Sequence, residues 1–102
     1  MNITNENQVC TIALTGELDH HAAKDISLKI TQAIDLNLPR QMYIDFSGIT
    51  FMDSSGIGVV IGAFKRMGQI DGTLSLVGVN RQNNKIFSAA NLQKIVKIET
   101  NE

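Results

Sequence analysis

Residues 51–58 read FMDSSGIG, and the apolar run Val59-Val60-Ile61 follows at once. Asp and Ser are preferred where a helix begins, because their side-chain oxygens accept hydrogen bonds from unpaired N–H groups of the first turn. From Ser54 to about Gln69, apolar residues recur at helical spacing: Ile57, Val60, Ile61, Phe64 and Met67. The stretch therefore predicts an amphipathic helix that begins at the two serines.

The segments before this helix predict strands and a further helix. Strand formers run from Val9 to Leu14 and end at Thr15-Gly16, and a short strand around Asn2–Asn5 could pair with them. In the next segment, from Ala22 to about Asn37, apolar residues fall at helical spacing, with Asp19 as the N-cap and Pro39 beyond the end. This segment predicts an amphipathic helix.

A strand is predicted from Met42 to Phe46, where apolar residues alternate until Ser47-Gly48 interrupts them. After the helix that starts at Ser54, the chain predicts a turn at Asp71-Gly72, a strand, a short helix with Ile86 and Phe87 inward, and a last strand. The ranges of the last three elements are Leu74 to Val79, Gln82 to Ala90 and Lys94 to Ile98.

Strands that alternate with helices imply a largely parallel sheet joined by right-handed crossovers. We therefore expect an α/β fold: one domain over residues 1–102, with a mixed, mostly parallel sheet of four to five strands. Three helices suffice to cover one face of so small a sheet, so the helices are expected mainly on one face.

The composition narrows the class of function. Nine Lys and Arg against ten Asp and Glu give a net charge of −1, which provides no electrostatic footprint for nucleic acid or an anionic membrane. One cysteine, Cys10, and two histidines provide no disulfide and no zinc-ligand spacing, so we expect neither metal nor cofactor. Without a signal peptide or a membrane-spanning apolar run, the chain is expected in the cytoplasm.

The stretch Asp53-Ser54-Ser55-Gly56 has two interpretations. It can cap the helix, or it can present free N–H groups and a partial positive charge to an anion such as a phosphate on serine. Gly58 and Gly62 follow Ser54 at spacings of four, although glycine lowers helix stability by about 1 kcal/mol relative to alanine. Either they leave a bare strip for a partner's backbone, or they pack closely inside the fold.

Enzyme chemistry has little support in the sequence. The serines do not form a G-x-S-x-G elbow, the available bases are the adjacent His20 and His21, and no G-x-x-x-x-G-K-[ST] loop is present. No pair of carboxylates converges on one site. We therefore expect no catalytic residue, and the residues alone indicate a small interaction domain.

Two motifs carry a resemblance to a known family. Thr15-Gly16-Glu17-Leu18-Asp19-His20-His21, followed by Phe51-Met52-Asp53-Ser54-Ser55-Gly56-Ile57-Gly58-Val59, closely resembles the STAS-domain anti-anti-sigma factors of spore-forming bacteria. The resemblance extends from Val9 to about Ile98, and neither motif departs from the family pattern.

The resemblance implies that Ser54 is phosphorylated by a partner that is both an anti-sigma factor and an ATP-dependent serine kinase. The unphosphorylated protein would bind this nucleotide-bound kinase and release the sigma factor, and a membrane-associated serine phosphatase would restore it. Ser55 is the second candidate phosphorylation site. Partner contacts are expected at Asp19, Asp53, Ser55, Gly56, Ile57, Gly58 and Gly62, without nucleic-acid binding or membrane insertion.

Three alternatives stay open at this point. The protein could act in a general-stress pathway by the same mechanism, although the run Glu17–His21 favours the sporulation type. It could instead be a serine or nucleotide hydrolase, or a scaffold that is never phosphorylated.

Overall fold

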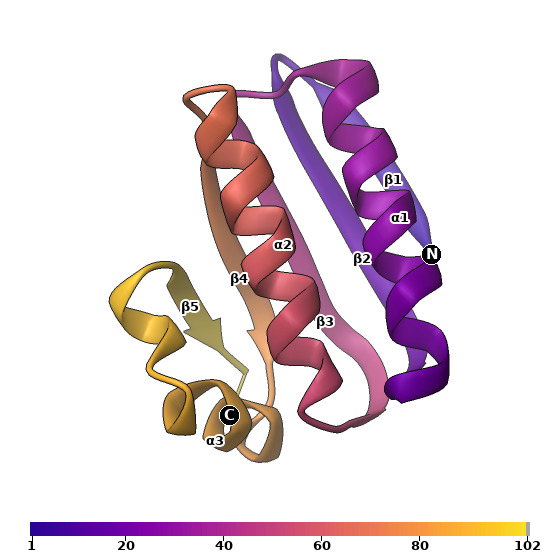
Figure 1. The fold of residues 1–102 in the computed structure, drawn as a ribbon, viewed down its shortest axis with the longest axis vertical. Coiled ribbons are helices and arrows are strands. Elements are labelled where there is room, and N and C mark those ends of the chain that lie inside the picture. Colours follow the sequence, from indigo (N-terminus) through magenta and orange to yellow (C-terminus); the bar gives the residue numbers. More distant parts are fainter. Residues whose placement is uncertain (102) are drawn as a thin grey trace.

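A five-stranded sheet forms the centre of the fold, and its strands are arranged in chain order (Figure 1). The computed structural model describes residues 1–101. The strands are β1 (Asn2–Glu6), β2 (Val9–Leu18), β3 (Gln41–Met52), β4 (Thr73–Val79) and β5 (Lys97–Thr100). Only β1 is antiparallel to its neighbour, and the pairs from β2 to β5 are parallel. The predicted α/β fold with a mixed, mostly parallel sheet is confirmed.

Two helices, α1 (His20–Asn37) and α2 (Ser55–Gln69), lie side by side over one face of the sheet (Figure 1). The shorter α3 (Arg81–Ala89) and the 3-10 turn η1 (Leu92–Lys94) lie beside β5 at one end of the molecule. The core between the sheet and the two long helices is apolar. Its largest fully buried side chains include Ile12, Leu14, Ile30, Ile34, Ile44, Phe46, Val60, Met67 and Leu76.

Strands β2 and β3 are longer than predicted. β2 continues through Thr15-Gly16 to Leu18, and β3 continues through Ser47-Gly48 to Met52, so the predicted strand ends at Leu14 and Phe46 are wrong. The ladder accommodates the turn-forming residues by register shifts between Ala13 and Thr15 and between Gly16 and Glu17. Gly16 adopts a φ of 84°, a conformation that glycine reaches without strain.

The C-terminal elements also shift from their predicted positions. The last strand covers Lys97–Thr100 and not Lys94 to Ile98. Lys94 belongs to η1, and the buried side chains of Leu92 and Val96 hold this turn in place before the strand begins. The N–H of Val96 donates to the carbonyl of Leu92 at 3.0 Å. In α3, Phe87 is buried as predicted, whereas Ile86 is only half-buried.

Gly78 offers a test of the point at which β4 separates from β3. Its φ is +65°, and a Cβ added there would lie 2.5 Å from Asp45 Oδ1 and 3.0 Å from the Ser47 nitrogen. We expect Gly78→Ala to lower the free energy of unfolding by about 1–3 kcal/mol, measured by urea denaturation. Gly68→Ala is the control, because a Cβ there meets nothing within 4 Å and should stabilise α2 by about 0.5–1 kcal/mol. A Gly78→Ala protein as stable as wild type would contradict this account.

Candidate functional site

The last residues of β2 and β3 lead directly into the two long helices. Leu18 pairs with Met52 at the end of the parallel ladder. Asp19 alone connects β2 to α1, and Asp53 and Ser54 connect β3 to α2. The N-termini of α1 and α2 therefore lie next to each other, and both predicted motifs meet at the carboxyl ends of β2 and β3.

The carboxylate of Asp53 joins the first turns of the two helices. Its Oδ1 accepts a hydrogen bond from the Ser55 N–H at 2.8 Å, and its Oδ2 accepts one from the His20 N–H at 3.3 Å. The Ser55 N–H is the main reason that the pKa of Asp53 lies below its ordinary value, and the Ser55 hydroxyl and His20 lower it further. Asp53 is therefore held as a carboxylate beside Ser54.

Asp19 is the N-cap of α1, as predicted. Its Oδ1 accepts hydrogen bonds from the N–H groups of His21 and Ala22, each at 3.0 Å. The side chain is half-buried and occupied within its own chain. A cap of this kind fixes where α1 starts and so positions the His20 N–H that reaches Asp53.

Ser54 occupies the N-cap position of α2, yet its side chain makes no capping hydrogen bond. The Ser54 hydroxyl therefore does not cap α2, and within the stretch predicted to cap this helix it is Asp53 that accepts the Ser55 N–H. Ser54 is exposed, whereas Ser55 is half-buried and its hydroxyl interacts with Asp53. The two serines thus differ clearly in accessibility to a partner.

The first N–H groups of α2 are already hydrogen-bonded. Besides the bond from Ser55 to the Asp53 carboxylate, the Gly56 N–H donates to the Asp53 carbonyl and the Ile57 N–H donates to the Ser54 carbonyl, both at 3.1 Å. The N–H groups of Ser55, Gly56 and Ile57 are therefore not the unpaired donors that the sequence led us to expect for an anion. A phosphate on Ser54 would face solvent beside Asp53.

The glycines of α2 fall into two groups. Gly58 and Gly62 are exposed, and a Cβ at either position would meet nothing within 4 Å. Close packing inside the fold is therefore excluded for this pair. Gly56 is buried, and a Cβ there would lie 2.5 Å from Met52 Sδ, so Gly56 belongs to the interior and not to the surface where it was predicted. Ile57, between them, is half-buried.

Phe51 is an exposed residue near the end of β3 that sequence reasoning missed. It lies opposite Glu17 in the β2–β3 pair, and the residue is 49% exposed. Its aromatic side chain three residues before Ser54 was the available signal, but the predicted end of β3 at Phe46 gave no basis for its orientation. Large exposed aromatic side chains often anchor protein partners.

Among residues 1–101, no cluster of three His, Cys, Asp or Glu side chains could hold a metal ion. The rings of His20 and His21 contact each other edge to face, with centroids 5.8 Å apart, and in this part of the chain no hydrogen bond joins either ring to Ser54. No helix in the same range has the length and apolar character needed to cross a bilayer.

Comparison with known proteins identifies relatives over nearly the whole chain. The model of the family described as STAS domain matches residues 1–102. An anti-sigma F factor antagonist of Paenibacillus polymyxa is 32% identical over 94 residues, which cover 92% of this chain and 80% of the relative. One of Lysinibacillus sphaericus is 36% identical over 90 residues, covering 88% and 75%. An anti-sigma-B factor antagonist of Listeria monocytogenes is 30% identical over 94 residues, covering 89% and 79%.

Solved structures of an anti-sigma factor antagonist also align with nearly the whole chain. The anti-sigma factor antagonist SpoIIAA in its unphosphorylated form aligns with a TM-score of 0.75 and 28% identity, over 99% of this chain and 88% of that chain. The phosphorylated form of the Bacillus protein SpoIIAA aligns with the same TM-score and identity, over 99% and 90%.

The depressed pKa of Asp53 predicts a dependence of stability on pH. A carboxylate whose pKa is lower in the folded than in the unfolded protein stabilises the fold above the ordinary Asp pKa of about 3.9, and this is lost as the pH falls through the folded-state pKa. We expect Asp53→Asn to have a lower Tm than wild type near neutral pH, and the difference to shrink below about pH 4.

Circular dichroism melts across this pH range measure the effect. Glu6→Gln, on the exposed strand β1, is the control for removing a carboxylate outside the site. A difference in Tm between Asp53→Asn and wild type that stays constant with pH would contradict the role assigned to Asp53.

Proposed function

We propose a function for this chain from the premise that it belongs to the STAS domain family. The protein is an anti-sigma factor antagonist of the sigma F type, a regulatory binding protein and not an enzyme. Its partner is an anti-sigma factor, which it binds so that the sigma factor is released. The proposed switch rests on the Ser54 hydroxyl, which is exposed, makes no capping hydrogen bond and lies next to Asp53 in the sequence.

The switch works by phosphorylation of Ser54. The anti-sigma factor acts as the serine kinase, in a complex with adenine nucleotide, and transfers phosphate to Ser54 in the cytoplasm. A serine phosphatase then restores the binding form. Ser54 is favoured over Ser55 because its hydroxyl is exposed and free of Asp53.

Phosphate on Ser54 blocks binding locally. A phosphoserine brings roughly −1.5 to −2 charges, and the neighbouring Asp53 carboxylate opposes them. Since the first N–H groups of α2 are already used, the phosphate gains little from the helix end beyond its partial charge. A partner that closes over this point has to desolvate poorly paired charge, at a cost on the order of several kcal/mol.

The fold itself is expected to change little on phosphorylation. SpoIIAA in its phosphorylated and unphosphorylated forms aligns equally well with this chain, which supports a local effect. In our proposal, the contact surface comprises Asp53, Ser54 and the exposed strip of Gly58 and Gly62, with Ile57 beside it. Asp19 and Ser55 shape this surface from within.

A second candidate has the same chemistry with another partner. The relative in Listeria monocytogenes is an anti-sigma-B factor antagonist, so a general-stress pathway is compatible with the fold. Measuring the affinity of the purified protein for anti-sigma factors of both types separates the two, and the sigma F type should bind more tightly.

Phosphate transfer is the first test of the switch. The protein is mixed with its cognate anti-sigma factor and ATP, and the modified residue is located by mass spectrometry. We expect phosphate on Ser54 in wild type and in Ser55→Ala, and none in Ser54→Ala. Phosphate that persists in Ser54→Ala, or that is absent from wild type, would overturn the proposed site.

The exposed glycines give a test in which stability and binding move in opposite directions. Gly58→Ala and Gly62→Ala should each stabilise the protein by up to about 1 kcal/mol, because the added methyl group meets nothing in the chain. The same methyl groups should weaken binding of the unphosphorylated protein to the anti-sigma factor by about tenfold in the double variant.

Thermal melts and isothermal titration calorimetry measure the two effects. Gln32→Ala on the exposed surface of α1 is the control and should leave the affinity unchanged. If Gly58→Ala/Gly62→Ala binds as tightly as wild type, the strip is not a site of close approach.

A further inference from the structure

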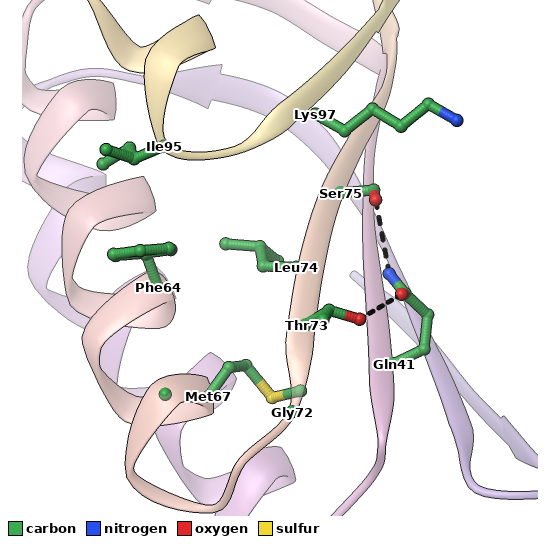
Figure 2. Close-up of a pocket in the computed structure, with 10 residues that line it drawn as sticks. Gln41, Phe64, Met67, Gly72, Thr73, Leu74, Ser75, Ile95 and Lys97 are labelled. Atoms are coloured by element: carbon green, nitrogen blue, oxygen red, sulfur yellow. Dashed lines mark hydrogen bonds between the residues drawn. The ribbon is translucent and has the colours of Figure 1, made fainter.

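A hollow of about 420 Å³ lies beside the C-terminal half of α2 (Figure 2). Its apolar lining comes from Phe64 and Met67 of α2, Leu74 of β4 and Ile95 after η1. In Figure 2, Phe64 and Ile95 lie on one side and Leu74 lies across from them. Ile95 is 45% exposed although it is a large apolar side chain. This part of the surface therefore offers apolar contacts that the chain itself does not fill.

The hollow is continuous with the site around Ser54. Ile57, Ile61 and Phe64 are spaced by four and three residues on one side of α2, and all three are half-buried. This apolar row begins in the first turn of α2 and ends in the hollow. We call the row together with the hollow the α2 groove.

The charges of the chain are separated between its two parts. Residues 54–102 carry six Lys or Arg and three Asp or Glu, a net charge of +3, whereas residues 1–53 carry three basic and seven acidic residues, a net charge of −4. Lys65 and Lys94 directly adjoin Phe64 and Ile95 in the sequence, and both are exposed. Within residues 1–101, neither of these two lysines forms a salt bridge.

The cation that lines the hollow, Lys97, is paired with Glu99. On the side of α2 that faces α1, Arg66 is paired with Asp35. A stable protein interface covers about 800 Å² on each partner, which is wider than the first two turns of one helix. The unfilled apolar surface lies on the groove side, and the exposed Lys65 and Lys94 are next to two of its residues in the sequence, so that side favours extension of the interface.

We propose that the α2 groove is a second part of the surface bound by the anti-sigma factor, and that the partner presents to it an acidic segment with apolar side chains. This inference rests on the proposed function and extends its contact surface beyond Ser54. Opposite charges across the interface speed association and select the partner, and the apolar row supplies area to bury.

The test measures binding of the cognate anti-sigma factor to unphosphorylated full-length protein by isothermal titration calorimetry. Two groove variants are used: Lys65→Glu/Lys94→Glu, which alters charge alone, and Ile95→Asp, which places a charge in the hollow. The matched controls on α1 are Lys24→Glu and Leu28→Asp, an exposed cation and an exposed apolar residue away from the groove. Thermal melts verify that each variant is folded.

We expect both groove variants to lose about tenfold or more in affinity, and the controls to stay within about twofold of wild type. The charge variant should also show a weaker dependence of affinity on salt than wild type. Ser54 should still be phosphorylated in the groove variants at saturating kinase, which shows that the site itself is intact. If Ile95→Asp fails to fold, the charge variant alone decides.

Groove variants that bind within about twofold of wild type would overturn the inference and leave the proposed function standing. A wild-type protein that neither binds the anti-sigma factor nor accepts phosphate would overturn the proposed function, and the groove inference with it. A short DNA duplex is the remaining probe. If wild type binds the duplex and Lys65→Glu/Lys94→Glu does not, while both bind the anti-sigma factor equally well, the two lysines serve nucleic acid. That result would overturn the inference.

Discussion

The parallel pairing of β2 with β3 extends further than the rest of the sheet, and the position of the site depends on it. β3 pairs with β4 only as far as Asp45 opposite Val77, whereas its pairing with β2 continues to Met52 opposite Leu18. The buried Leu18 and Met52 pack at the end of this ribbon, and Gly56 leaves room for them at the start of α2. Packing below the surface therefore fixes where Ser54 emerges.

Asp53 then couples the two helices at this edge. Because its carboxylate accepts N–H groups from both Ser55 and His20, the first turn of α2 is held against the first turn of α1 without help from the Ser54 hydroxyl. A group added to Ser54 removes no hydrogen bond that the helix needs, so the fold can tolerate modification while the surface presented to a partner changes strongly.

The sequence predicts the order of the elements, the cap at Asp19 and the start of α2, because these depend on residues within one or two turns. It fails at the ends of β2 and β3. Thr15-Gly16 and Ser47-Gly48 are turn formers locally, but Thr15 lies opposite Gly48 in a parallel ladder that accommodates these residues through register shifts. The exposure of Gly58, Gly62 and Phe51, and the burial of Gly56, depend on neighbours distant in the chain and could not be read from spacing.

The net charge does not reveal that acidic and basic residues are separated in the fold. A chain with a net charge of −1 gives no reason to expect electrostatic attraction, yet its C-terminal part is basic and its N-terminal part acidic. Under the proposed function, such a separation would orient an approaching acidic partner toward α2 before contact. Ser54 lies at the boundary between the two parts, so in this proposal a phosphate there would obstruct the contact and reduce the positive potential beside it. Modification of one hydroxyl would then slow association as well as weaken the complex.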